Sequence, residues 1–200
     1  MNLPNKLTML RIFMIPLFIA CFFLPSGWTI GTLNGVAFQW NYVIAAVIFF
    51  LAYITDTIDG RLARARGLIT DFGKLMDPTA DKLLSSAALI MLCKYEVMSF
   101  GNFLMPVFAF IIIAREIFVS GIRQLAASKG IVVAAKPIGK AKTTLQFFAL
   151  LFTMLLGPLF RAIRIPVDFI LMVLAVILTI WSGIDYTIGA KDLFKEMQCE

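Results

Sequence analysis

Residues 12–55 read IFMIPLFIACFFLPSGWTIGTLNGVAFQWNYVIAAVIFFLAYIT, 44 consecutive positions without a charged side chain. A helix that crosses a bilayer needs about 20 predominantly apolar residues, so this stretch can supply two such helices and a turn. Proline, serine, glycine and asparagine, the residues typical of turns, gather between Pro25 and Gly35. We therefore expect one membrane span near 12–25 and a second near 40–58.

The composition of the whole chain is that of a membrane protein. Of its 200 residues, 60% are hydrophobic and 15% are charged, and the mean hydropathy is +0.91. Soluble domains average about 45–50% apolar and about 25% charged residues. A soluble domain of this size could not bury the excess, which excludes a soluble enzyme, a disordered tail and a disulfide-stapled secreted module. The chain contains no histidine, so any acid–base chemistry falls to carboxylates, lysine or tyrosine.

Four more apolar runs bring the expected total to six spans in an all-α integral membrane protein, near 83–98, 102–121, 145–160 and 166–188. Two of the runs are short or interrupted, which leaves five or seven spans as alternatives. Most lysines and arginines lie before the first span or within 61–82, 123–142 and 191–195. The positive-inside rule therefore predicts that both termini and the two basic segments, 61–82 and 123–142, are cytoplasmic.

The N-terminal segment has two interpretations. Residues 1–11 look amphipathic, with Leu3, Leu7 and Leu10 on one side and with Lys6 and Arg11 long enough to extend to the membrane surface, which predicts a short interfacial helix before the first span. A cleaved signal peptide would share the basic start and the apolar core. No small-x-small cleavage site is evident near Leu24, so we favour an uncleaved first span.

Carboxylates occur where a membrane span should exclude them. Asp56 and Asp59 are three residues apart, and Asp77 and Asp81 are four apart, so each pair shares one face of a helix. If the chain turns at 65–72, the two helices become antiparallel neighbours and all four carboxylates converge near the cytoplasmic end. Converging anions require cations, and an all-oxygen ligand set suits Mg²⁺ or Mn²⁺ in a two-metal site. The alternative is structural, with Asp56 ending one helix in water and Asp77 capping the next.

The complete pattern is D-x2-D-G-x2-A-R-x8-G-x3-D-x3-D, with its fixed positions at Asp56, Asp59, Gly60, Ala63, Arg64, Gly73, Asp77 and Asp81. This pattern resembles the signature of the CDP-alcohol phosphatidyltransferase family, and every position is filled. The resemblance implies a six-helix membrane fold, usually dimeric, with two divalent cations. It also implies a reaction that moves a phosphatidyl group from a CDP-linked lipid to an alcohol and releases CMP.

The resemblance also implies a role for each matching residue. Asp56, Asp59, Asp77 and Asp81 would hold the metals, and Asp81 would also accept the proton of the attacking hydroxyl. Gly60, Ala63 and Gly73 would let the CDP-lipid approach the helices, and the fork of Arg64 would meet its diphosphate. Asn5, Thr8 and Arg11 recur every three residues on one helix face. We expect Asn5 and Thr8 at the CDP head group and Arg11 at a substrate phosphate.

Three further segments, 3–11, 115–123 and 139–146, are similar to those of bacterial phosphatidylglycerophosphate synthases. They imply sn-glycerol 3-phosphate as the acceptor and CDP-diacylglycerol as the donor. Arg115 lies inside the apolar run Phe108–Val119, where an arginine is costly and is usually functional or paired. Its neighbour Glu116 occupies a different helix face, so we do not expect the two to pair. The residues expected at the acceptor phosphate are Arg11, Arg115, Ser120, Arg123, Lys140 and Lys142.

Two other functions are compatible with parts of this pattern. The same fold could act on inositol, inositol phosphate, serine or an amino alcohol, although the basic segment favours a phosphorylated acceptor. An aspartate-lined transporter of divalent cations is disfavoured by Arg64, because a cation path avoids fixed positive charge. We therefore expect one catalytic domain over 1–200, homodimeric, in the bacterial cytoplasmic membrane with its active site on the cytoplasmic side. Its expected partners are lipids and a second copy of the chain, without nucleic acid.

Overall fold

A computed structural model describes residues 3–25, 28–66, 71–95, 98–128 and 137–189. Side chains are described within these ranges except at 3–8, 56–66, 71–78, 81, 95, 128 and 137. In chain order the elements are α1 (Leu3–Cys21), β1 (Thr29–Leu33), β2 (Val36–Gln39), α2 (Trp40–Arg66), α3 (Asp71–Tyr95), the 3-10 helix η1 (Asn102–Leu104), α4 (Met105–Ser128), α5 (Pro137–Ile163) and α6 (Val167–Gly189).

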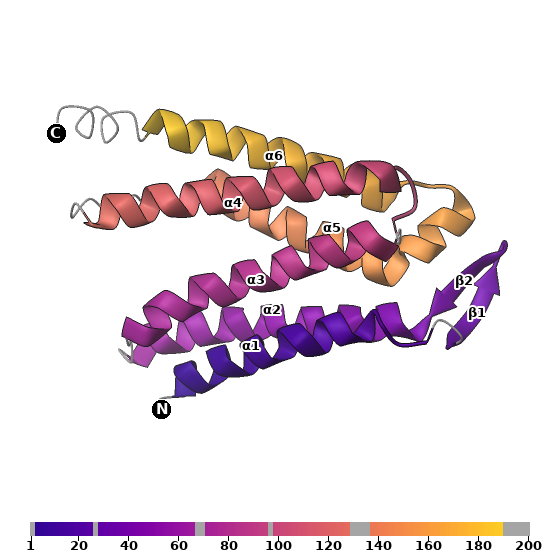
Figure 1. Ribbon diagram of the computed structural model, residues 1–200, viewed down its shortest axis with the longest axis horizontal. Helices are drawn as coiled ribbons and strands as arrows, with labels where there is room; N and C mark the ends of the chain where they lie inside the picture. Colours follow the sequence, from indigo (N-terminus) through magenta and orange to yellow (C-terminus); the bar gives the residue numbers. More distant parts are fainter. Residues whose placement is uncertain (1–2, 26–27, 67–70, 96–97, 129–136, 190–200) are drawn as a thin grey trace.

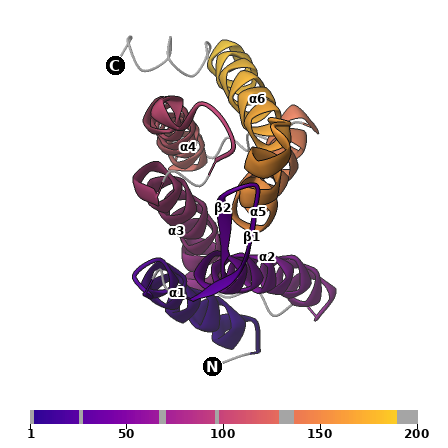
Figure 2. The same cartoon turned by 90° about the vertical axis from the view of Figure 1, so that its right-hand side faces the viewer.

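The long helices run back and forth along one axis and form a closed bundle (Figure 1). Around the bundle the order of contacting helices is α1, α2, α5, α6, α4, α3 and again α1. Figure 2 shows this arrangement end-on, with the α3–α4 pair facing the α5–α6 pair and α1 and α2 below them. The start of α1, the ends of α2, α4 and α6 and the starts of α3 and α5 all meet at one end, which we call the site end. The hairpin and the α3–α4 and α5–α6 connections lie at the far end.

The apolar runs become helices of membrane length, as expected. Within the described ranges, three segments are long and apolar enough to cross a bilayer: Asn102–Ala127, Ile138–Ile163 and Val167–Gly189. Helices α1 and α2 contain shorter apolar segments, Met9–Cys21 and Trp40–Thr55. In both helices, the residues between the apolar segment and the site end include polar and charged ones. The six helices are therefore consistent with a multi-pass membrane protein.

The expectation of an all-α chain was wrong at residues 29–39. Strands β1 and β2 pair antiparallel, with Leu33 opposite Val36. Asn34 and Gly35 form the turn with φ values of 50° and 80°, a combination that asparagine and glycine tolerate and that suits a two-residue hairpin. The Asn34 amide also donates a hydrogen bond to the carbonyl of Ala162, 3.1 Å away, which ties the hairpin to the end of α5. The sequence indicated turn residues at Asn34 and Gly35. The residues on either side of that turn carry no charges, so their sequence did not distinguish strand from helix.

From Leu3 on, the segment expected as an interfacial helix and the first expected span form one helix. Helix α1 is continuous from Leu3 to Cys21 and includes Pro16. The side chain of Arg11 is only 1% exposed, on a helix that packs against α2 and α3. Neighbouring helices therefore cover this arginine, which distinguishes it from a side chain that extends along a membrane surface.

Small side chains bring the helices close together in the core. Ala45, Ala46 and Ala52 on α2 and Ala88 on α3 are at most 1% exposed, and small residues allow helix backbones to approach closely. Between α2 and α5 the contact is aromatic. The ring of Phe147 stacks on Tyr53 at 3.7 Å and on Phe49 at 5.4 Å between ring centroids. This contact positions the start of α5 against the aspartate-bearing end of α2.

Candidate active site

The four signature aspartates lie at the site end of the bundle. Asp56 and Asp59 are on the last part of α2, and Asp77 and Asp81 are on the first part of α3. These antiparallel helices are in contact, and their aspartate-bearing ends lie side by side (Figure 1). Four carboxylates on two adjoining helix ends would supply the all-oxygen ligand set that Mg²⁺ and Mn²⁺ prefer. The chain's residues therefore fit the expected divalent cations.

The side chains of the signature lie outside those that the structure describes. This holds for the four aspartates, for Arg64 and Ala63, and for Asn5 and Thr8, and the backbone places Gly60 on α2 and Gly73 on α3. The part of the chain with described side chains contains no group of three or more potential metal ligands. The assignment of the metal ligands and of the CDP-lipid contacts therefore stays a prediction.

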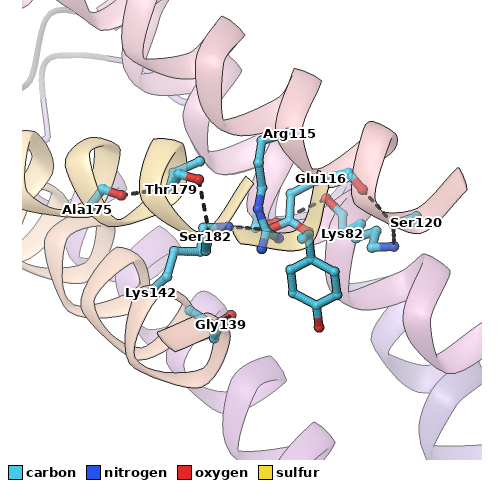
Figure 3. Close-up of polar contacts among 12 residues, drawn as sticks. Lys82, Arg115, Glu116, Ser120, Gly139, Lys142, Ala175, Thr179 and Ser182 are labelled. Carbon is cyan, nitrogen blue, oxygen red and sulfur yellow. Dashed lines mark hydrogen bonds and ion pairs between the residues drawn. The ribbon is translucent and has the colours of Figure 1, made fainter. Parts of the chain in front are cut away.

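An ion cluster that includes one buried lysine lies beside this end, where side chains of α3, α4 and α5 meet (Figure 3). Lys142 on α5 is 1% exposed, and its Nζ donates a hydrogen bond to Oε1 of Glu116 on α4. The guanidinium of Arg115 approaches the same oxygen, with Nη1 3.9 Å from Oε1. A buried ammonium requires a counterion, and Glu116 on α4 supplies it to Lys142 on α5 through this side-chain contact.

A second contact joins α3 to α4 in the same cluster. Lys82 donates from Nζ to the hydroxyl of Ser120, and that hydroxyl donates to the backbone carbonyl of Glu116. Lys82 directly follows Asp81 in the sequence. The contact therefore links the α3 turn that carries the last signature aspartate to Glu116 and its cations.

The arginines of α4 also contact α6. Arg123 donates from Nη2 to the hydroxyl of Tyr186, and its Cζ lies 5.1 Å from the centroid of that ring. Arg115 approaches the same ring, with Cζ 5.6 Å from the centroid. Both distances are within the range of a cation–π interaction. Gly183 makes room for this packing, since a Cβ at that position would lie 3.3 Å from Cγ of Arg115.

The cluster carries an excess of positive charge. Lys82, Arg115, Arg123 and Lys142 are four cations, and Glu116 is one carboxylate, so these five side chains sum to +3. An excess of positive charge among these side chains favours an anionic ligand. The Nε of Arg115 has no hydrogen-bond partner among the described residues, which leaves a donor for such a ligand.

A cavity of about 60 Å³ lies beside Glu116 and Lys82. Its walls come from four helices: Phe49 and Tyr53 on α2, Lys82, Leu84 and Ser85 on α3, Glu116 on α4, and Thr143, Gln146, Phe147 and Leu150 on α5. The cavity thus lies among four helices, next to the ion cluster, and its walls are mainly apolar with a few polar groups.

Four of the six residues expected at the acceptor phosphate, Arg115, Ser120, Arg123 and Lys142, belong to this cluster. Lys142 contacts a carboxylate of the protein itself. Lys140 is exposed in the first turn of α5, and Arg11 is buried on α1. Their roles in binding a phosphate stay predictions.

The expectation that Arg115 and Glu116 would not pair was wrong. Adjacent helical residues do point to different faces, but both side chains are long enough for their charged ends to approach each other. Lys142 contacts the same carboxylate oxygen of Glu116 that Arg115 approaches. Sequence reasoning also missed Lys82, Gln146 and Tyr186. The position of Lys82 directly after a signature aspartate was a usable signal for it, whereas nothing in the sequence distinguishes Tyr186.

Comparison with known proteins agrees with the signature. Residues 1–181 match the CDP-alcohol phosphatidyltransferase family. The chain belongs to this family. It is 38% identical over 186 residues to the CDP-diacylglycerol--glycerol-3-phosphate 3-phosphatidyltransferase of Bacillus subtilis (strain 168), which covers 92% of this chain and 93% of the relative. It is 36% identical to the protein of the same name from Sodalis glossinidius (98% of both chains). The identity to that of Pseudomonas fluorescens is 35% (93% and 88%).

Proposed function

We propose that this protein transfers the phosphatidyl group of CDP-diacylglycerol to sn-glycerol 3-phosphate and releases CMP. The observation that carries the proposal is the similarity over nearly the full length to relatives named for this reaction. The complete aspartate signature supports the same reaction class, because it supplies every position that the family pattern requires.

We infer a division of labour within the signature. Asp56, Asp59, Asp77 and Asp81 would hold two divalent cations, Mg²⁺ or Mn²⁺, which neutralise charge on the diphosphate and on the leaving CMP. Arg64 would bind the diphosphate through its planar fork. Asp81 would also accept the proton of the attacking hydroxyl.

The ion cluster supports a phosphorylated acceptor. Arg115 and Arg123 lie two helical turns apart on α4, and the Nε of Arg115 has no hydrogen-bond partner among the described residues. Lys140 is exposed in the first turn of α5. An excess of three positive charges beside the aspartate-bearing helices fits an acceptor that brings a phosphate. It fits neutral alcohols such as inositol or serine less well.

The decisive experiment measures CMP release by the purified protein with CDP-diacylglycerol, Mg²⁺ and a panel of acceptors. We expect release with sn-glycerol 3-phosphate, loss of release on adding a chelator, and recovery with Mg²⁺ or Mn²⁺. Release only with inositol phosphate or serine would reassign the acceptor. No release with any alcohol, together with uptake of divalent cations into liposomes, would overturn the proposal in favour of transport.

We also propose that the protein is a homodimer in a bacterial cytoplasmic membrane, with the site end on the cytoplasmic side. The excess of lysine and arginine in the segments at that end supports the orientation, and the family pattern supports the dimer. Accessibility of cysteines introduced at Ser128 and at Gly31 to a membrane-impermeant reagent tests the orientation. The mass of the detergent-solubilised protein tests the dimer.

A further inference from the structure

Gln146 is a buried polar side chain with an unused acceptor. It lies on α5, is 4% exposed, and its Oε1 has no hydrogen-bond partner among the residues that the structure describes. Buried polar atoms are nearly always paired, so an exception at the wall of a cavity indicates a ligand or a water. The Gln146 side chain lines the cavity of about 60 Å³ described above.

Two hydroxyls in the walls of this cavity also present acceptors, alongside the ammonium of Lys82 and the phenol of Tyr53. The hydroxyl of Thr143 donates its proton to the carbonyl of Gly139 at 3.0 Å, and that of Ser85 donates to the carbonyl of Lys82 at 3.1 Å. Each hydroxyl has thereby used its only proton and offers only lone pairs to the cavity. The cavity therefore favours a small group that donates hydrogen bonds.

The charges around the cavity select a neutral donor. The carboxylate of Glu116 lines one side, which disfavours a phosphate, and Lys82 lines another, which disfavours an ammonium group. A hydroxyl meets both conditions. One water needs about 10–15 Å³ of such volume, so a cavity of about 60 Å³ also admits the carbon that carries a hydroxyl.

The cavity lies close to the reacting end of the site. Tyr53 precedes Asp56 by three residues, which is about 4.5 Å along a helix axis, and Lys82 directly follows Asp81. Arg123 and Lys140 lie nearer the site end, towards the ends of their helices. An acceptor whose phosphate binds at that end would extend its polyol part towards the cavity.

We propose that Gln146 determines acceptor specificity by accepting a hydrogen bond from the hydroxyl next to the reacting one. In sn-glycerol 3-phosphate this is the central hydroxyl. The inference rests on the proposed function and adds that the acceptor site recognises this central hydroxyl. A site built to bond a hydroxyl rejects an analogue that lacks it, because its buried acceptor is then left unpaired.

The test compares sn-glycerol 3-phosphate with 3-hydroxypropyl phosphate, which lacks only the central hydroxyl. The wild-type protein should prefer the natural acceptor by about 100-fold or more in kcat/KM. Gln146→Met keeps the shape of the side chain without its polar atoms. It should lower kcat/KM for sn-glycerol 3-phosphate by about 10- to 100-fold, leave that for the analogue nearly unchanged, and leave KM for CDP-diacylglycerol unchanged.

The matched control is Gln124→Met, the same substitution at an exposed position of α4, which should change none of these constants. Gln146→Leu provides a second variant if the methionine protein does not fold. If either Gln146 variant lowers activity with both acceptors equally, or with neither, the cavity holds only water and the proposal is overturned. The proposed function would still stand in that case, since it depends on wild-type turnover of sn-glycerol 3-phosphate alone.

Discussion

The two ends of the bundle each contain a buried or half-buried carboxylate, and the two carboxylates have different kinds of partner. At the far end Asp168 on α6 is fully buried. It accepts hydrogen bonds from the backbone N–H of Ser99 at 2.8 Å, from the Ser99 hydroxyl, and from the N–H of Phe169 at 3.0 Å. Towards the site end, the side chain of Glu116 is 22% exposed and contacts the cations of Lys142 and Arg115.

This difference separates a structural carboxylate from one in a binding region. The partners of Asp168 are backbone N–H groups and a hydroxyl, which cannot exchange it for a substrate and which join the α3–α4 connection to α6. The partners of Glu116 are side-chain cations in excess over it, and a cavity lies beside it. Cations that outnumber their carboxylates can bind a further anion, whereas a carboxylate satisfied by neutral donors stabilises the fold.

The largest effect should come from Asp81→Asn at the site end. Asparagine retains the shape but cannot accept the proton of the attacking hydroxyl, so CMP release should fall by about 1,000-fold or more. Binding of CDP-diacylglycerol, measured at equilibrium, should persist. Turnover equal to that of the wild-type protein would refute the role of Asp81.

A smaller effect on catalysis is expected from Glu116→Gln. The buried ammonium of Lys142 loses its counterion, so stability should fall by about 3 kcal/mol. The cations beside it should lose their arrangement, raising KM for sn-glycerol 3-phosphate by about 10-fold, equivalent to about 1.4 kcal/mol. Thermal unfolding in detergent and steady-state kinetics measure the two effects. An unchanged KM would make Glu116 a structural residue like Asp168.

Asp168→Asn supplies the matched change at the far end. One or more hydrogen bonds to a charged acceptor are lost, so stability should fall by about 2 kcal/mol. Asp168 lies at the far end of the bundle, and the signature aspartates lie at the site end. The KM values for both substrates should therefore stay within about a factor of two of wild type. A rise in KM comparable to that of Glu116→Gln would remove the distinction between the two ends.

The smallest effect should come from the hairpin. Asn34→Ala removes the hydrogen bond to Ala162 and places alanine at a φ of 50°, a conformation that costs about 1 kcal/mol for such a residue. Stability should fall by about 1–2 kcal/mol with no change in kinetic constants. A variant Asn34→Gly, which accepts this φ, should recover part of the loss; equal loss in both variants would assign the effect to the hydrogen bond alone.

The sequence predicted the helices better than the connections between them. The runs near 102–121 and 166–188 lie within or close to α4 and α6, because long uninterrupted apolar segments can satisfy their backbone only as helices. The start of α5 at Pro137 lies eight residues before the expected 145. The charged residues at the start of α5 are helical but have no apolar periodicity, so hydropathy could not detect them.

Within the candidate site, the signature was readable because its chemistry is encoded in fixed local spacing on two consecutive helices. The ion cluster was only partly readable. Arg115 and Lys142 were expected to bind a phosphate, and an arginine within an apolar run was a sound signal. Glu116 was set aside because its relation to Arg115 was considered only along one helix, whereas its principal partner is on another.

The amino-acid sequence alone determined the membrane class, the apolar segments and the metal-binding aspartate pattern that we propose, since each follows from local composition or short-range spacing. Only the tertiary structure decided which distant groups meet: Lys142 with Glu116 across 26 positions, Lys82 with Ser120 across 38, and Arg123 with Tyr186 across 63. It also placed Gln146, a buried residue with an acceptor unused among the described residues, in the wall of a cavity. Such contacts depend on how separate helices pack, because the energy of burying each charge is set by whatever partner the neighbouring helix supplies.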